Sequence, residues 1–364
     1  MTMARGELVD STVTPYYHCI SRCVRRAFLC GEGCEHRKQW IEDRLRELDS
    51  IFAVEVAAYA VLDNHLHVVL KLNNVVAAEW SDEDVVRRWG RLFPPRGKDR
   101  QPLEVSEAWV ALQLKDAKWI AETRKRLNSL GWFMKCLKEP LARMANKEDK
   151  CKGTFFEGRF KSIAILDEEA LLTTLAYVDL NLVAAGIAKT PEESAHTSVK
   201  ARVDHCRELG TLAAVVDQPV DRTKHDQPQE DESFWLVPIE DRRELKVSGL
   251  GVQVSGNAGE GRTSDGKVVG RAGISANMNL AGYLQLLDWS SRLLRHGKAR
   301  VPKDVAGILS RLGSSPGFWQ DRLEKLRDRS RSFGTVFATK REDINRLAEA
   351  RGVRKLSNLN GCPS

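Results

Sequence analysis

Two histidines separated by one apolar residue, His65 and His67, are the side chains whose spacing points most directly to chemistry. They lie in a β-branched and leucine-rich run typical of a strand, in which successive side chains point to opposite faces of the sheet. Both imidazoles therefore share one face, and the opposite face is apolar and carries Leu66, Val68, Leu70 and Leu72. Because imidazole is the commonest metal ligand, the pattern predicts two ligands of a metal site, although a histidine on a strand is more often an ordinary hydrogen-bonding side chain.

A tyrosine and an asparagine four residues apart, Tyr177 and Asn181, lie on a helix predicted over 167–186. Asp167 is a candidate N-cap and Gly186 a stop signal, and residues four apart stand one turn above the other on a helix face. Such a face could carry chemistry. The pair alone is weak evidence, because a half-buried tyrosine and an asparagine near a helix end are also common packing and hydrogen-bonding residues.

Cations alternate with aromatic residues and glycines in the segment Lys152–Ser162, just before that helix. Basic side chains bind phosphates and aromatic rings stack on bases, so this composition is typical of a track for single-stranded nucleic acid. An edge strand with a solvated face has the same composition, and both interpretations stay open. The candidate phosphate contacts are Arg159 and Lys161 in this segment, and Arg22 and Arg25 near the start of the chain.

Three segments, in this order, resemble the single-tyrosine HUH transposases and in particular their REP-associated tyrosine transposase branch. They are Tyr16–Arg22, Ala58–His67, and Gly158–Ser162 together with Tyr177–Asn181. The order and spacing carry the resemblance, since each segment alone is unspecific.

The resemblance implies a metal-dependent DNA endonuclease and strand-transferase. It assigns His65, His67 and Asn181 to a divalent cation, Mg²⁺ or Mn²⁺, and makes Tyr177 the nucleophile that attacks a DNA phosphodiester and forms a 5′-phosphotyrosine. It also implies single-stranded or hairpin DNA as the partner, no nucleotide cofactor, and a homodimer as an open alternative to a monomer. After Asn181 the chain departs from the family pattern, because Leu182 replaces a usual proline and alanines replace basic residues.

The composition is that of an ordinary globular chain with a basic excess. The 364 residues carry 57 lysines and arginines against 50 acidic residues, and the net charge of +7 with a pI near 9.0 favours a polyanionic partner. The eight cysteines lack the CxxC pairs of zinc ribbons and predict reduced, structural thiols. The sequence shows neither a charged leader nor a run of about 18 apolar residues, so we expect a cytoplasmic protein without a membrane span.

The predicted elements begin with a β-α-β-β order, over residues 16–22, 35–50, 53–62 and 63–72. A strand near 160–166 and the helix that carries Tyr177 complete a ferredoxin-like antiparallel sheet, so the predicted fold class is α+β, of the HUH endonuclease type. A further helix is predicted over 121–146, and Pro140 is expected to kink or end it.

The sequence divides into four parts. They are a catalytic domain over 1–190 with a helical insertion at about 73–120, a connecting segment over 191–245, a glycine-rich linker over 246–276, and a mainly helical accessory domain over 277–364.

Two other function classes stay open beside the endonuclease. A non-catalytic DNA-binding regulator on the same fold would keep the basic surface and would need neither Tyr177 nor a metal. A histidine-triad nucleotide hydrolase would need a third alternating histidine, and Val69 occupies that position. A covalent adduct formed with single-stranded DNA and Mn²⁺ separates the endonuclease from the regulator.

Overall fold

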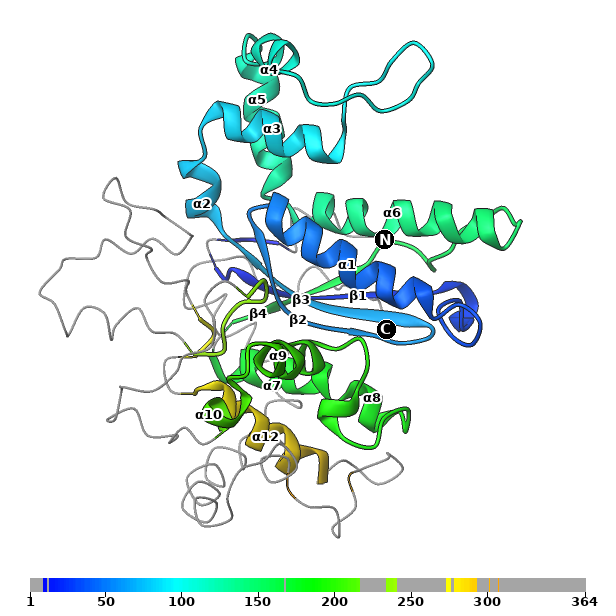
Figure 1. Cartoon of the computed structure of the whole chain (residues 1–364), viewed down its shortest axis with the longest axis vertical. Helices are drawn as coiled ribbons and strands as arrows, with labels where there is room; N and C mark the ends of the chain where they lie inside the picture. Colours follow the sequence, from blue (N-terminus) through cyan, green and yellow to red (C-terminus); the bar gives the residue numbers. More distant parts are fainter. Residues whose placement is uncertain are drawn as a thin grey trace, which may run out of the picture.

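The computed structural model describes residues 9–11, 13–166, 168–216, 234–240, 273–275, 278–292, 301 and 307. Figure 1 shows a sheet that lies between a pair of helices on one face and a group of helices on the other. The sheet has four antiparallel strands in the order β2-β3-β1-β4, with bounds Val54–Val61, His65–Leu72, Tyr16–Arg22 and Lys161–Ile165. The predicted α+β class with a ferredoxin-like antiparallel sheet is confirmed.

Helices α1 (His36–Ile51) and α6 (Leu130–Glu148) cover one face of this sheet (Figure 1). The apolar side chains of β3 that alternate with its histidines belong to the same cluster as these helices, namely Leu66, Val68, Leu70 and Leu72. α6 is therefore the second helix of the βαββαβ unit. The prediction that the helix over 168–186 takes this place is wrong, because that helix follows β4 and packs on the opposite face.

The opposite face is covered by α7 (Glu168–Asp179) and α9 (Ser198–Glu208), with three further helices beneath them (Figure 1): α8 (Asn181–Ala184), α10 (Leu212–Val216) and α12 (Leu280–Arg292). A short 3-10 turn, η3 (Pro191–Glu193), precedes α9. β2 contributes alanines to this face, and a bulge between Val56 and Ala58 places Ala57 and Ala58 there together. Small side chains at these positions let the helices approach the sheet closely.

The helix predicted over 121–146 is two helices. α5 ends at Leu127, Asn128 departs from helical geometry at φ −111° and ψ 43°, and α6 begins at Leu130. Pro140 lies inside α6 and does not end it. The break turns α6 away from the helical insertion, so that α6 runs along α1 and covers the same face of the sheet.

The helix predicted over 167–186 is also divided. Leu180, with ψ of 1°, separates α7 from α8, but its N–H still donates to the Ala176 carbonyl at 2.9 Å. Residues 177 and 181 therefore stay one turn apart. Gly186 ends the helical segment with φ of 73°, a backbone conformation that glycine adopts without a side-chain clash. Asp167 lies outside the described residues.

Between β3 and α6 the chain forms four helices that project from one end of the sheet (top of Figure 1): α2 (Asn74–Glu79), α3 (Asp82–Leu92), α4 (Glu107–Gln113) and α5 (Ala117–Leu127). Each begins at a capping side chain that accepts a backbone N–H, namely Asn73, Ser81, Ser106 and Asp116. The predicted linker over 246–276 lies outside the described residues except for 273–275. α12, within the predicted accessory domain, packs in the same apolar cluster as α7.

Membrane insertion through a helix finds no support in the described part of the chain, where every helix is too short or too polar to cross a bilayer.

One buried cation joins the ends of the two helices that cover the first face. Arg37, at the start of α1, is 1% exposed and donates from Nε to Glu148 at 3.0 Å and from Nη1 to the Leu29 carbonyl at 2.8 Å. It also forms an ion pair with Asp149. These bonds fix α1 against the end of α6 and hold the loop that precedes α1.

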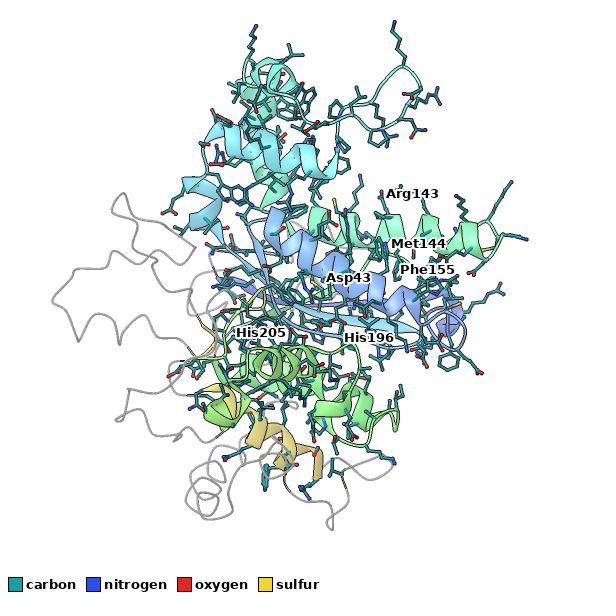
Figure 2. All side chains as sticks on the ribbon, viewed as in Figure 1. Asp43, Arg143, Met144, Phe155, His196 and His205 are labelled. Atoms are coloured by element: carbon teal, nitrogen blue, oxygen red, sulfur yellow. The ribbon has the colours of Figure 1, made fainter. Side chains whose placement is uncertain are left out.

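We expect Arg37→Ala to lower the free energy of unfolding by about 2 kcal/mol, because it removes a buried guanidinium that pairs with two half-buried carboxylates and donates to a backbone carbonyl. Urea unfolding followed by circular dichroism measures the change. The matched control is Arg143→Ala, since Arg143 lies on the outer side of α6 (Figure 2) and is 3.8 Å from Glu139. The control should change stability by less than about 0.5 kcal/mol; equal effects of the two variants would contradict this assignment.

Candidate functional site

The antiparallel pairing of β1 with β3 gathers histidines on the face covered by α7. In this register Arg22 lies opposite His65, and His18 lies opposite Val69. Directly paired residues point to the same side of a sheet, so His18 and Arg22 share a face with His65 and His67. The sequence predicts two histidines at this site, and the structure brings a third.

His18 forms a buried pair with His67. Its Nε2 lies 2.9 Å from Nδ1 of His67, the two rings stack at 5.1 Å between centroids, and the side chains are only 2% and 3% exposed. His18 is not among the residues singled out from the sequence. The alternating pattern of Tyr16–Arg22 predicts which face of the sheet His18 occupies. Its partner His67 is identified only by the register between two strands that lie far apart in the chain.

The helical segment above this face brings Tyr177 and Asn181 to the same histidines. The Tyr177 ring lies 5.6 Å from the His67 ring and 6.1 Å from the His18 ring, centroid to centroid. Nδ2 of Asn181 lies 3.4 Å from Nε2 of His67, and the His65 ring lies 4.9 Å from the His67 ring. Tyr177 is 41% exposed, so its side chain can reach a molecule bound from solvent.

Both strand histidines are neutral at physiological pH. Burial, followed by the nearby His18, His65 and Arg22, lowers the pKa of His67 to about 2. Burial, with a smaller contribution from Arg22, also lowers the pKa of His65. Neutral imidazole is the form that binds a metal ion, and a group with this pKa cannot serve as a proton donor near pH 7.

The metal ligands predicted from the sequence are two imidazoles and an amide, those of His65, His67 and Asn181. The described residues hold no group of three histidine, cysteine, aspartate or glutamate side chains arranged around a common metal position. The distance of 3.4 Å between Nε2 of His67 and the Asn181 amide nevertheless suits two ligands of one small divalent cation, which lie about 3 Å apart. Rotating the amide by half a turn presents its oxygen in place of Nδ2. His67 and Asn181 therefore lie close enough to share a small divalent cation, and the chemistry of the neighbouring His65 imidazole suits a third ligand.

The four predicted DNA contacts lie around the ends of β1 and β4. Arg22 is exposed at the end of β1, and Arg25 is exposed in the 3-10 turn η2 (Val24–Arg26) that follows. Arg159 is exposed just before β4, and Lys161 pairs with Ile20, so it points to the same face as the histidines. The structure thus places two of these cations on the site face and two in the adjoining loops.

The basic and aromatic segment before β4 is a loop, and strand β4 begins only at Lys161. Backbone bonds hold this loop beside η2, since the Val24 N–H donates to the Phe155 carbonyl at 2.9 Å and the Glu157 N–H donates to the Arg22 carbonyl at 2.9 Å. The buried Phe155, labelled in Figure 2, anchors it in the apolar cluster against which Met144 of α6 also packs. The two loops that carry Arg25 and Arg159 are therefore held side by side, and Arg22 lies opposite His65.

A buried carboxylate fixes the helix that carries Tyr177. Asp179 accepts the Val199 N–H at 2.9 Å, the Ser198 hydroxyl, and the Tyr283 hydroxyl at 2.6 Å. Burial raises the pKa of Asp179, and these donors together with Arg202 act in the opposite direction. Because Val199 and Tyr283 belong to α9 and α12, both helices help to set the position of Tyr177.

Comparisons with known proteins give one structural similarity at low level. No protein-family model matches the chain, and no curated protein matches it. The chain is similar to a solved structure described as "Structure of the REP associates tyrosine transposase bound to a REP hairpin", with 14% sequence identity and a TM-score of 0.30. The similarity covers 56% of this chain and 86% of that chain. At this TM-score it carries no weight for function, which the geometry of the site has to support.

We expect Asp179→Leu to lower the free energy of unfolding by about 3 kcal/mol or more, because it leaves three buried donors without their acceptor. Asp179→Asn keeps an acceptor oxygen and should cost about 1 kcal/mol, and Tyr283→Phe, which removes a single hydrogen bond, should cost a similar amount. Urea unfolding of the three variants measures the order. A Leu variant as stable as the Asn variant would contradict the role of this network.

Proposed function

We propose that the chain is a metal-dependent DNA endonuclease and strand-transferase that nicks single-stranded DNA through a 5′-phosphotyrosine on Tyr177. The observation that carries the proposal is the packing of an exposed tyrosine against two buried histidines. Tyr177 lies against His67 and His18, and Asn181 lies beside the Nε2 atom of His67. The family resemblance of the motifs agrees with these roles.

His65, His67 and Asn181 would hold the divalent cation, Mg²⁺ or Mn²⁺, and histidine ligands favour Mn²⁺ in vitro. When bound, the cation supplies Lewis-acid polarisation of the scissile phosphate. The protein's own contribution is to keep both imidazoles neutral and to fix the helix that carries Tyr177. Burial lowers the pKa of both histidines, and Asp179 holds that helix.

In the proposed reaction the Tyr177 oxygen attacks the scissile phosphorus and the bond from phosphorus to the 3′-oxygen breaks. The phenol loses its proton to solvent, and the leaving 3′-oxygen takes one up, so a free 3′-hydroxyl and a 5′-phosphotyrosine result. The phosphotyrosine ester keeps the energy of the broken bond. Attack by a 3′-hydroxyl on this ester rejoins DNA and releases Tyr177, and no ATP is needed.

The DNA backbone would follow the basic edge formed by the loops beside β1 and β4. Arg22 and Lys161 point to the site face, whereas Arg25 and Arg159 extend the edge beyond it. These contacts recognise phosphates and give no base specificity by themselves. The family resemblance of the motifs implies single-stranded or hairpin DNA, so hairpin DNA is the first structured substrate to test here.

Incubation with a library of structured single-stranded oligonucleotides and Mn²⁺ tests the proposal. A complex that survives denaturing electrophoresis and carries both protein and DNA is the expected product. Binding without any covalent product, under conditions in which the protein is folded and Mn²⁺ is bound, would favour the non-catalytic regulator instead.

Tyr177→Phe removes one oxygen and should abolish the covalent adduct while DNA affinity changes by less than about 2-fold, because phosphate contacts elsewhere carry most of the binding. Denaturing gels and fluorescence anisotropy measure the two effects on the same sample. The matched control is Tyr16→Phe in β1, which should retain the adduct. An adduct that persists in Tyr177→Phe would show that another residue is the nucleophile.

His65→Ala and His67→Ala should each reduce cleavage by at least about 100-fold with oligonucleotide binding largely kept, because each removes a ligand and leaves the basic edge in place. Asn181→Ala should have a smaller effect, since water can replace a neutral amide ligand. The control is His205→Ala in α9 (His205 is labelled in Figure 2), where the histidine stacks on Phe234. Cleavage at the wild-type rate in either strand variant would rule out this metal site.

A further inference from the structure

The loop that follows β1 combines an unusual backbone conformation with exposed basic and aromatic side chains. Arg25 and Arg26 adopt positive φ values of 54° and 56°, and they are the only adjacent non-glycine pair with this conformation among the described residues. Left-handed backbone is strained for such side chains and is kept where the surroundings impose it, often at binding sites. Phe28, 68% exposed, is the most exposed of the large apolar side chains in the same described part. Two exposed arginines beside an exposed ring suit a phosphate and a neighbouring base.

The turn between β2 and β3 imposes this conformation. The Cys23 N–H donates to the Asn64 carbonyl at 2.8 Å, and the Cys30 N–H donates to the Asp63 carbonyl at 2.8 Å. Between these two anchors, Nδ2 of Asn64 donates to the Arg26 carbonyl at 3.3 Å. The loop and the turn therefore form one hydrogen-bonded unit, in which the Asn64 side chain holds the strained arginine pair.

The same side chain orients His65. A carbonyl oxygen only accepts, so the bond to Arg26 identifies the donor end of the Asn64 amide and leaves Oδ1 as its other end. Oδ1 lies 2.6 Å from Nδ1 of His65, which must then carry the hydrogen. The lone pair of the neutral imidazole is on Nε2, the atom left to bind a cation. His67 has a comparable neighbour, since its Nδ1 lies 2.9 Å from Nε2 of His18, and this contact orients its ring.

We propose that Asn64 is a positioning residue that couples the arginine loop to the His65 ligand, so that DNA bound on the loop and a cation bound at the histidines strengthen each other. This inference rests on the proposed function. A phosphate seated on Arg25 and Arg26 steadies the Arg26 carbonyl, and with it the Asn64 amide and the His65 ring. By thermodynamic linkage, the factor by which DNA tightens the cation equals the factor by which the cation tightens DNA.

Two substitutions separate the two halves of the Asn64 amide. Asn64→Ala removes both the bond to the Arg26 carbonyl and the bond to His65. Asn64→Asp keeps an acceptor for the His65 N–H but loses the donor, and it faces the Arg26 carbonyl with an oxygen. The matched control is Asn74→Ala at the start of α2, where the asparagine bonds to Ser11 and Asn128 away from the site.

The test is a titration of Mn²⁺ into the full chain, followed by electron paramagnetic resonance of free Mn²⁺, with and without single-stranded oligothymidylate. All proteins carry Tyr177→Phe so that no cleavage occurs during the measurement. In this background we expect oligothymidylate to tighten Mn²⁺ binding several-fold. Asn64→Ala should weaken Mn²⁺ binding by about 10-fold to 100-fold and abolish the effect of the oligonucleotide.

Asn64→Asp should bind Mn²⁺ at least as tightly as the parent protein and yet show no response to oligothymidylate, a pattern that general damage to the fold would not produce. If Asn64→Ala does not fold, Asn64→Asp decides. The proposed coupling is wrong if Asn64→Ala binds Mn²⁺ with the affinity of the parent protein, or if Asn64→Asp responds to DNA as the parent protein does. Either result would leave the proposed function standing. A parent protein that binds no Mn²⁺ would overturn the proposed function together with this inference.

Discussion

The register of β1 against β3 is the constraint on which the site depends. It places Arg22 opposite His65 and sets His18 within 2.9 Å of His67, on the face that α7 covers. A slip by one residue would move each strand's side chains to the other face, so the leucines that pack under α1 and α6 also hold the histidines in place. The apolar core and the polar site are thus two consequences of one pairing.

Hydrogen bonds from neighbouring residues hold the polar groups of the site in place. His18 and Asn64 bond to the Nδ1 atoms of the two strand histidines, and Asp179 ties the Tyr177 helix to α9 and α12. The proposed binding of a cation and a phosphate would gain from ligands fixed before either arrives, since less order is then lost on binding. Tyr177 itself stays partly exposed, as the proposed attack on a macromolecular substrate requires.

Local patterns in the sequence predict much of this arrangement. Alternation gives the strands and the shared face of His65 and His67, and turn residues place the hairpin between β2 and β3. The partner of His67 and the second helix over the sheet depend on contacts between distant segments, and no local pattern reports them. The helix breaks at Asn128 and Leu180 are similar cases, because neither residue is a strong helix breaker and packing determines where the chain turns.

The most direct test of this account is to find which residue carries DNA. After reaction with a structured oligonucleotide and Mn²⁺, the adduct is digested with trypsin and nuclease, and the modified peptide is sequenced by mass spectrometry. The peptide over 162–189 contains Tyr177 as its only tyrosine and no internal lysine or arginine, so the assignment is unambiguous. If Tyr177 is the nucleophile, a nucleotide is found on Tyr177 in this peptide. A nucleotide on any peptide that contains Tyr16, Tyr17, Tyr59 or Tyr283 would contradict that role.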